Sequence, residues 1–229
     1  MAAPTTRRRR AARDEVPGIA VERRYWQDGA TVAGIDEVGR GAWAGPLTLA
    51  AVVLPPDRRM YKLRDSKLLS PAERERLAGR LEAFALGIGL GHATNDEIDR
   101  YGLSRAMGIA AHRAVAELPV RPDVALLDGH WDFLDDPTVV TETMVRGDAR
   151  CASIAAASIT AKVARDRLLI EAAPRHPPYA FADNKGYPSP VHVAALEEHG
   201  PCPLHRRSWA PIAALDHPRL FESTPYRAG

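Results

Sequence analysis

Short apolar runs that end at acidic residues constrain this sequence more than any other feature. Three runs with the composition of strands have this form: Thr31–Asp36, Asp123–Asp128 and Thr138–Val145. Carboxylates stand at or just beyond their ends, namely Asp36 with Glu37, Asp128, and Asp148. Because α/β proteins place functional sites at the ends of strands, such carboxylates can meet at one sheet edge, although each taken singly also fits a surface loop. The pattern predicts an oxygen-rich site shared by several strands.

The remaining segments alternate between strands and helices. Leu47–Leu54 and Phe84–His92 are further apolar runs with the character of strands. Helices are expected at Pro71–Ala83, Leu103–Leu118, Cys151–Ala172 and Pro190–His199. The first helix follows Ser70 and carries Glu73 at its third position, which is a capping-box start. Two neighbouring strands followed by strand–helix alternation predict one mixed α/β sheet with helices packed on it.

Composition limits the class of protein. The chain has 229 residues, 45% hydrophobic and 26% charged, so it can bury a large core and is neither a disordered chain nor a collagen. No apolar run reaches the roughly 20 residues of a membrane-spanning helix, and the basic N-terminus lacks the apolar segment of a signal peptide. Two cysteines, Cys151 and Cys202, are too few for a disulfide framework. We expect a cytoplasmic protein without membrane association.

The distribution of charge sets the N-terminal segment apart. Five arginines lie between Arg7 and Arg13, although the formal charge of the whole chain is only +2. Residues 1–30 are therefore expected to form a basic, flexible tail, either simply solvated or a weak tether to phosphates. Residues 31–215 form the expected folded domain, and residues 216–229 a second tail. Because the domain is nearly neutral, any nucleic-acid binding must come from local patches.

Carboxylates without accompanying cysteine suit hard cations such as Mg²⁺ or Mn²⁺. Asp36 and Glu37 are adjacent, and adjacent side chains of a regular strand point to opposite faces. For both to reach one site the strand must bend or bulge, which Gly39 and Gly41 make feasible. Arg40 lies between these glycines, in a turn whose amides can line a nucleic-acid backbone. The same segment is also compatible with an ordinary tight turn.

Six blocks of the sequence resemble, in order, those of bacterial ribonuclease HII, the type 2 ribonuclease H. The first is GIDEVGRGAWAGPLTLAAVVLP, and the last is NKGYPSPVHVAALEEHGPCPLHRRSW. The blocks lie at Gly34–Pro55, Asp65–Leu77, Asp96–Val115, Leu126–His130, Val145–Leu168 and Asn184–Trp209. The resemblance implies a ribonuclease-H-like mixed sheet flanked by helices, with a small helical C-terminal extension. About 30 residues precede the first strand, too few for the extra domain of ribonuclease HIII.

The resemblance also implies the reaction and its metal ligands. The carboxylates of the family motifs correspond to Asp36, Glu37, Asp128 and Asp148, which would hold two Mg²⁺ or Mn²⁺ ions. Two such ions activate water, neutralise the phosphate and stabilise the leaving oxygen. The expected substrates are RNA–DNA hybrids and single ribonucleotides in duplex DNA, cut 5′ of the ribonucleotide to leave 5′-phosphate and 3′-hydroxyl ends. Asp166 is a less favoured ligand, expected on a helix surface or paired with Arg165 or Arg167.

Further residues gain substrate-binding roles from the same resemblance. Gly39, Arg40 and Gly41 would grip the ribonucleotide through backbone contacts to its 2′-hydroxyl. Tyr187 would stack on the next sugar, unless it is only a core tyrosine. Lys67 and Lys162 are candidates for phosphate contacts, and each is equally compatible with a solvated surface. The expected assembly is a monomer.

Some departures from the family pattern leave alternatives open. Ala42 replaces the usual proline, and His130 follows Asp128-Gly129, where it either borders the site or is a loop residue. The cluster His205-Arg206-Arg207 could face nucleic acid or form structural ion pairs. Resolvases and transposases also set carboxylates on such a sheet, and an inactive adaptor would bind hybrids without cutting them. An assay of Mg²⁺-dependent cleavage against binding separates these classes.

Overall fold

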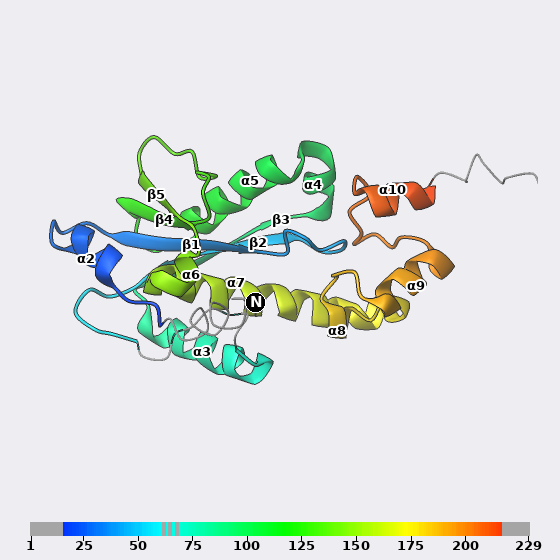
Figure 1. Ribbon diagram of the computed structural model, residues 1–229, viewed down its shortest axis with the longest axis horizontal. Coiled ribbons are helices and arrows are strands. Elements are labelled where there is room, and N and C mark those ends of the chain that lie inside the picture. The colour runs from blue at the N-terminus through cyan, green and yellow to red at the C-terminus, as the bar shows by residue number, and fades with distance from the viewer. Residues whose placement is uncertain (1–15, 61–62, 64–65, 67–68, 217–229) are drawn as a thin grey trace, which may run out of the picture.

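The fold is organised around a five-stranded mixed sheet with the strand order β3-β2-β1-β4-β5 (Figure 1). The computed structural model describes residues 16–216 apart from 61–62, 64–65 and 67–68. The strands are β1 (Val32–Val38), β2 (Leu47–Val53), β3 (Gly87–Ala93), β4 (Val124–Asp128) and β5 (Val140–Met144). β1, β2 and β3 pair antiparallel, whereas β4 runs parallel to both β1 and β5. The predicted mixed α/β sheet is confirmed.

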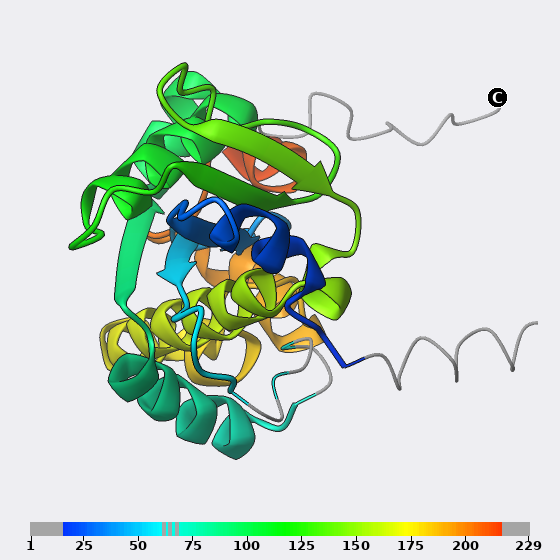
Figure 2. The same cartoon turned by 90° about the vertical axis from the view of Figure 1, so that its left-hand side faces the viewer.

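Helices cover both faces of this sheet (Figures 1 and 2). α5 (Leu103–Ala116) packs on β2 and β3 from one side, preceded by the short α4 (Asn95–Tyr101). α7 (Ala152–Ala172) packs on β1 and β2 from the other side, with α3 (Pro71–Phe84) against its outer surface. Each interface has its own apolar cluster. β2, which lies between β3 and β1, is buried along its whole length because helices cover it on both faces.

Glycine permits the close approach of α7 to the central strand. A Cβ on Gly34 of β1 would lie 2.2 Å from the carbonyl carbon of Ser153, in the first turn of α7. Real Cβ atoms do not approach backbone so closely, so this position requires glycine. The start of α7 therefore lies directly over β1 at Gly34, which is two residues before Asp36 in the sequence.

Helix starts follow the predicted chemistry where it was visible in the sequence. The Ser70 side chain accepts from the amide of Glu73, whose carboxylate accepts from the Ser70 amide, so the capping box is confirmed. Thr94 and Glu97 form a second capping box at α4, a helix that the sequence analysis did not identify. The long alanine-rich helix begins at Ala152, with Cys151 as its N-cap residue.

The C-terminal extension is helical and lies beyond the C-terminal half of α7 (Figure 1). Its elements are η2 (Ala173–Arg175), η3 (Pro177–Tyr179), α8 (Phe181–Asn184), α9 (Pro190–His199) and α10 (Ala210–Asp216). They share an apolar cluster with Ala44 and Leu169, which anchors the extension to the β1–β2 connection and to α7. No helix within the described ranges is long and apolar enough to span a membrane.

The expectation that residues 1–30 form a flexible tail is wrong for the part the structure describes. α2 (Ala20–Trp26) lies against the sheet beside α6 (Gly147–Arg150) and the start of α7 (Figure 2). Gly18 pairs with Cys151 in a parallel bridge, and Glu22 is fully buried. Its Oε1 accepts from the Ser153 amide at 2.8 Å and from the Cys151 thiol at 3.0 Å. A buried glutamate is not visible in a sequence rich in charged residues, which explains the error.

Candidate active site

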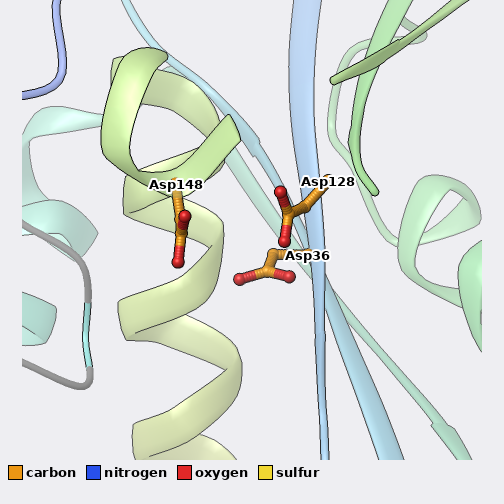
Figure 3. A group of neighbouring side chains, drawn as sticks. All are labelled: Asp36, Asp128 and Asp148. Carbon is orange, nitrogen blue, oxygen red and sulfur yellow. The ribbon is translucent and has the colours of Figure 1, made fainter. Parts of the chain in front are cut away.

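Three carboxylates from three separate segments meet at one edge of the sheet (Figure 3). Asp36 lies within β1, Asp128 ends β4 and Asp148 lies in the short helix α6. Each offers an oxygen within 4.8 Å of those of the other two. Figure 3 shows Asp36 and Asp128 projecting from neighbouring strands, with Asp148 facing them from the helical side. Asp36 and Asp148 are buried, so this group is a built site and not a solvated acidic surface.

Strand pairing and one turn bring the three together. Ile35 pairs with Leu127 in the parallel β1–β4 ladder, which sets the next residues, Asp36 and Asp128, side by side. The Gly147 amide donates to Asp128 Oδ1 at 2.7 Å, and this bond holds the start of α6 against the end of β4. A Cβ on Gly147 would lie 2.5 Å from Ile154 Cδ1 and 3.3 Å from that same carboxylate oxygen. Asp148 thus lies in a helical turn that packs tightly against Ile154 and Asp128 at Gly147.

The electrostatics of Asp36 are those expected of a site that binds a cation. Burial raises the pKa of the Asp36 carboxyl well above its usual value, and the nearby charges of Glu37, Asp128 and Asp148 raise it further. A hydrogen bond with the Ser158 side chain acts in the opposite direction. Like charges held together in a buried site are stabilised by a bound cation. The all-oxygen donor set fits a hard divalent ion such as Mg²⁺ or Mn²⁺.

Glu37 lies outside the group of three. The predicted bend at this point is not found, because β1 pairs regularly with β2 from Ala33 to Val38. Its side chain is half-buried and lies 3.7 Å from the Arg40 guanidinium. It lines a second hollow together with Asp128 and His130, so it borders the carboxylates from the side. His130 is therefore a residue that borders the site.

Tyr187 and Lys162 line the same small pocket as Asp36 and Glu37. The Tyr187 ring is half-buried, with Lys162 Nζ 6.0 Å and Arg165 Cζ 5.4 Å from its centroid. Lys162 Nζ donates to Asp166 Oδ1 at 2.6 Å, and burial lowers the pKa of this lysine. Asp166 therefore pairs with Lys162, and not with either neighbouring arginine as predicted. Lys67 lies outside the described residues.

Two buried arginines, whose roles the sequence did not indicate, hold the Gly39-Arg40-Gly41 turn and the segment after it from inside. Arg206 donates to the carbonyl oxygens of Gly39, Arg40 and Gly45, at 2.7 to 3.2 Å. Arg165 donates to those of Ala44, Pro46 and Lys185, at 2.8 to 2.9 Å. Both side chains are fully buried, and burial lowers the pKa of each, to about 9 for Arg206. A guanidinium that binds only backbone belongs to no sequence motif, so neither role could be predicted.

The two glycines of this turn differ in whether the fold requires glycine at their positions. Gly39 has φ +89°, and its added Cβ would lie 2.2 Å from Arg165 Nε. Gly41 has an ordinary φ, and a Cβ there would meet no described atom within 4 Å. The fold itself therefore requires glycine at position 39 and leaves position 41 free.

In the cluster His205-Arg206-Arg207, the first two residues match neither alternative considered for it. His205 and Arg206 are buried, at 1% and 0% exposure. His205 contacts His192 through ring nitrogens 2.9 Å apart, and Arg206 binds the carbonyls already described. The Arg207 amide donates to Asp99 at 2.8 Å. His205 and Arg206 therefore join the C-terminal extension to the turn instead of facing nucleic acid.

Buried carboxylates at one edge of a ribonuclease-H-like sheet, beside a glycine-rich turn, define the class of metal-dependent nucleases. Residues 33–212 match the family model described as Ribonuclease HII. Ribonuclease HII of Streptomyces coelicolor is 48% identical over 203 residues, covering 88% of this chain and 87% of that protein. Ribonuclease HII of Thermus thermophilus is 45% identical over 206 residues, covering 90% of this chain and 98% of that protein.

A solved structure agrees with the sequence matches. Ribonuclease H2 from Pyrococcus horikoshii superposes with a TM-score of 0.68 at 28% identity, covering 81% of this chain and 97% of that one. The chain therefore belongs to the ribonuclease HII family, whose members are metal-dependent nucleases that hydrolyse RNA in RNA–DNA hybrids. The predicted family and its ribonuclease-H-like fold are both confirmed.

Proposed function

We propose that this protein hydrolyses the RNA strand of RNA–DNA hybrids and also cuts on the 5′ side of single ribonucleotides embedded in duplex DNA. One observation carries the proposal: Asp36 of the carboxylate group shares a pocket with Tyr187 and with Val38, the residue that precedes the Gly39-Arg40-Gly41 turn. Groups that could hold metal ions and groups that could recognise a ribonucleotide thus lie within reach of one phosphodiester. The expected products carry 5′-phosphate and 3′-hydroxyl ends.

Asp36, Asp128 and Asp148 would hold two Mg²⁺ or Mn²⁺ ions, and Glu37 would complete the set from its neighbouring hollow. When bound, such ions activate a water molecule, neutralise the scissile phosphate and stabilise the leaving oxygen. The Glu37 amide donates to Asp36 Oδ1 at 2.8 Å and helps to hold this carboxyl in place. The Gly147 amide does the same for Asp128, at 2.7 Å.

The turn would recognise the 2′-hydroxyl, the group that distinguishes RNA from DNA. Its carbonyl oxygens are drawn inward by Arg206, and within the described part of the chain the amides of Arg40 and Gly41 donate to no protein acceptor. Gly41 has no steric reason of its own to be glycine, which supports a close approach by something other than the protein. A ribose against these amides would meet donors at its 2′-oxygen.

Tyr187 would pack on the sugar that follows the ribonucleotide and favour deoxyribose there. Its ring lies against Lys162 and Arg165 and opens on the pocket that contains Asp36. A misplaced ring would shift the scissile phosphate relative to the carboxylates, and small shifts of this kind cost much of the rate. Lys162 remains a proposed phosphate contact, and so does Lys67. The monomeric state and the cytoplasmic location also stay predictions.

Cleavage of three matched duplexes tests the proposal. One contains a single ribonucleotide, one is a continuous RNA–DNA hybrid and one is all DNA, each labelled at its 5′ end and incubated with Mg²⁺, with Mn²⁺ or with EDTA. We expect metal-dependent cutting of the first two, 5′ of the ribonucleotide in the first, and none of the third. Binding without cutting would indicate an adaptor, and cutting of the all-DNA duplex would indicate a resolvase-like enzyme.

A further inference from the structure

Behind Tyr187 a chain of hydrogen bonds runs through two buried histidines. His192 Nδ1 lies 2.8 Å from the Tyr187 carbonyl oxygen, and His192 Nε2 lies 2.9 Å from His205 Nε2. The amide of Cys202 donates to His205 Nδ1 at 2.9 Å. Both rings are fully buried, at 0% and 1% exposure, among the aromatic rings of Tyr179 and Phe181.

The two ends of this chain fix every proton along it. The Tyr187 carbonyl can only accept, so His192 carries its proton on Nδ1 and presents a bare Nε2. His205 must then donate from Nε2, which leaves its Nδ1 bare for the Cys202 amide, a group that can only donate. The Cys202 carbonyl, 3.3 Å from the same His205 nitrogen, already accepts from the His205 amide at 3.0 Å. One arrangement, with both rings neutral, satisfies the contacts of His192 with Tyr187, of His192 with His205 and of His205 with the Cys202 amide.

Electrostatics agree with this arrangement. Burial lowers the pKa of His192, and burial together with the neighbouring His192 lowers the pKa of His205 to about 4. A proton added to His192 would set its Nε2–H against the Nε2–H of His205, 2.9 Å away. A proton added to His205 would set its Nδ1–H against the Cys202 amide, also 2.9 Å away. The pair is therefore neutral at physiological pH and keeps a defined direction.

The histidine pair connects the two parts of the proposed recognition site. At the His205 end, the pair is fastened to the segment after the glycine-rich turn. His205 forms an isolated antiparallel bridge with Ala44, and the Arg206 amide donates to the Trp43 carbonyl. At the other end, His192 is hydrogen-bonded to the backbone carbonyl of Tyr187. The Gly186 carbonyl accepts from the amides of Trp43 and Ala44, at 2.8 and 3.2 Å, and closes the loop.

We propose that His192 and His205 are positioning residues, which fix the Tyr187 ring relative to the Gly39-Arg40-Gly41 turn through one proton-ordered relay. This inference rests on the proposed function, because it assigns a purpose to the placement of Tyr187. Neither ring touches the substrate or the carboxylates. Their effect is on which substrate is cut well, and the chemistry itself is left to the carboxylates.

The proton order is tested directly by nuclear magnetic resonance. Long-range ¹H–¹⁵N correlation spectra of the full chain, labelled with ¹⁵N-histidine, distinguish the two neutral tautomers and the charged ring at pH 7. We expect the Nδ1–H form for His192 and the Nε2–H form for His205. Signals are assigned with the His192→Asn and His205→Asn variants. An Nε2–H form at His192, or a charged ring at either position, would overturn the relay.

The consequence for substrate choice is tested with two variants at one position. His192→Leu removes the donor to Tyr187, whereas the amide of His192→Asn can replace Nδ1 as a donor to that carbonyl. We expect His192→Leu to lower incision at a single ribonucleotide about tenfold, well beyond its effect on a continuous hybrid, and His192→Asn to recover most of the loss. His199→Leu, at a half-exposed histidine of the same helix, is the matched control.

The outcomes separate this inference from the proposed function. If Tyr187→Ala loses incision at the junction while a folded His192→Leu keeps the wild-type ratio between the two substrates, the positioning role is wrong and the function of Tyr187 stands. If Tyr187→Ala itself keeps normal incision, the proposed sensing role fails, and the positioning role with it. If His192→Leu does not fold, the incision ratio of His192→Asn and the tautomers measured in the wild type still test the positioning role. The double variant Tyr187→Ala/His192→Leu should show little loss beyond that of Tyr187→Ala.

Discussion

At the scale of single residues, the fold and the proposed reaction ask for different side chains at neighbouring positions. Asp36 is costly to the fold, because it is buried among other carboxylates. Gly39 is required by the fold, because Arg165 occupies the space of its Cβ. Gly41 is required by neither burial nor backbone conformation. Substitutions at these positions therefore distinguish structural from functional requirements.

Asp36→Asn should abolish metal-dependent cleavage and stabilise the metal-free protein. The pKa of the Asp36 carboxyl is raised in the fold. The stability that its neutral form contributes is therefore lost as pH rises through the folded pKa, so the carboxyl makes the folded protein less stable at neutral than at acidic pH. We expect a gain of about 1–2 kcal/mol, or roughly 2–4 °C per kcal/mol in Tm. Thermal melts with EDTA and with Mn²⁺ check this, since the wild type alone should gain from Mn²⁺. More than a few percent of residual activity would remove Asp36 from the centre of the site.

Asp148→Asn should reduce the rate far more than Asp166→Asn. Asp148 lies within the carboxylate group, whereas Asp166 is bonded to Lys162 on the far side of the Tyr187 pocket. Loss of Asp148 removes a ligand charge, and we expect a drop of at least about 100-fold against less than about tenfold. Rates on a continuous hybrid at saturating Mg²⁺ decide the order. The reverse order would show that Asp166 is the fourth ligand.

Gly41→Ala should leave Tm within about 1 °C of the wild type while it weakens cutting at a ribonucleotide, because only the substrate needs that space. Gly39→Ala should lower the free energy of unfolding by about 2–4 kcal/mol, through its positive φ and the contact with Arg165. Melting temperature and incision rate are measured on the same samples. A Gly41→Ala protein with normal incision would argue against close contact between the turn and the ribose.

At the scale of elements, the site depends on how segments far apart in sequence are fastened together. α6 carries Asp148 and is tied to β4 through Asp128, while α2 holds the start of α7 from the other side. Cys151, the N-cap residue of α7, makes no capping hydrogen bond with its side chain. Glu22 takes over this role by accepting from the Ser153 amide. The helix that follows directly from the Asp148 segment is thus capped by a residue more than a hundred positions away.

Glu22→Ala should destabilise the protein by about 1–3 kcal/mol, because the Ser153 amide and the Cys151 thiol would lose their buried acceptor. Arg23→Ala, at the exposed next position, is the matched control and should change stability by no more than about 0.5 kcal/mol. Urea unfolding measured for both gives the difference. Equal stabilities would show that α2 contributes nothing to the anchoring of α7.

At the scale of the whole molecule, the C-terminal extension is joined to the sheet domain by buried polar groups as well as by an apolar cluster. Arg165 and Arg206 bind backbone carbonyls of the β1–β2 connection, and the neutral His192–His205 pair links that layer to Tyr187. Polar groups of this kind are costly when unpaired. The stability of the molecule should therefore respond to the protonation of the histidine pair.

Stability should fall as pH drops from about 6.5 to 4, in part through His205. Its pKa is lowered in the fold to about 4, so over this range the unfolded chain binds the proton and the folded protein does not. The full shift corresponds to roughly 3 kcal/mol. His205→Gln removes this titration, so urea unfolding across the range should show a shallower pH dependence than in the wild type or in His199→Gln. Identical slopes would show that His205 is charged in the fold.

The sequence by itself determined the strand pattern, the capping box at Ser70 and the group of acids at strand ends, because these depend on local propensity and on the geometry of parallel strands. The resemblance to ribonuclease HII added the family. The tertiary structure alone decided that Glu37 stays on its own face of a regular strand, that Asp166 pairs with Lys162, and that Glu22 is buried. Only the tertiary structure shows that Arg165, Arg206 and the His192–His205 pair point inward and bind backbone groups. Polar side chains that bind distant backbone leave no periodicity or spacing in a sequence, since their partners are chosen by the packing of whole elements.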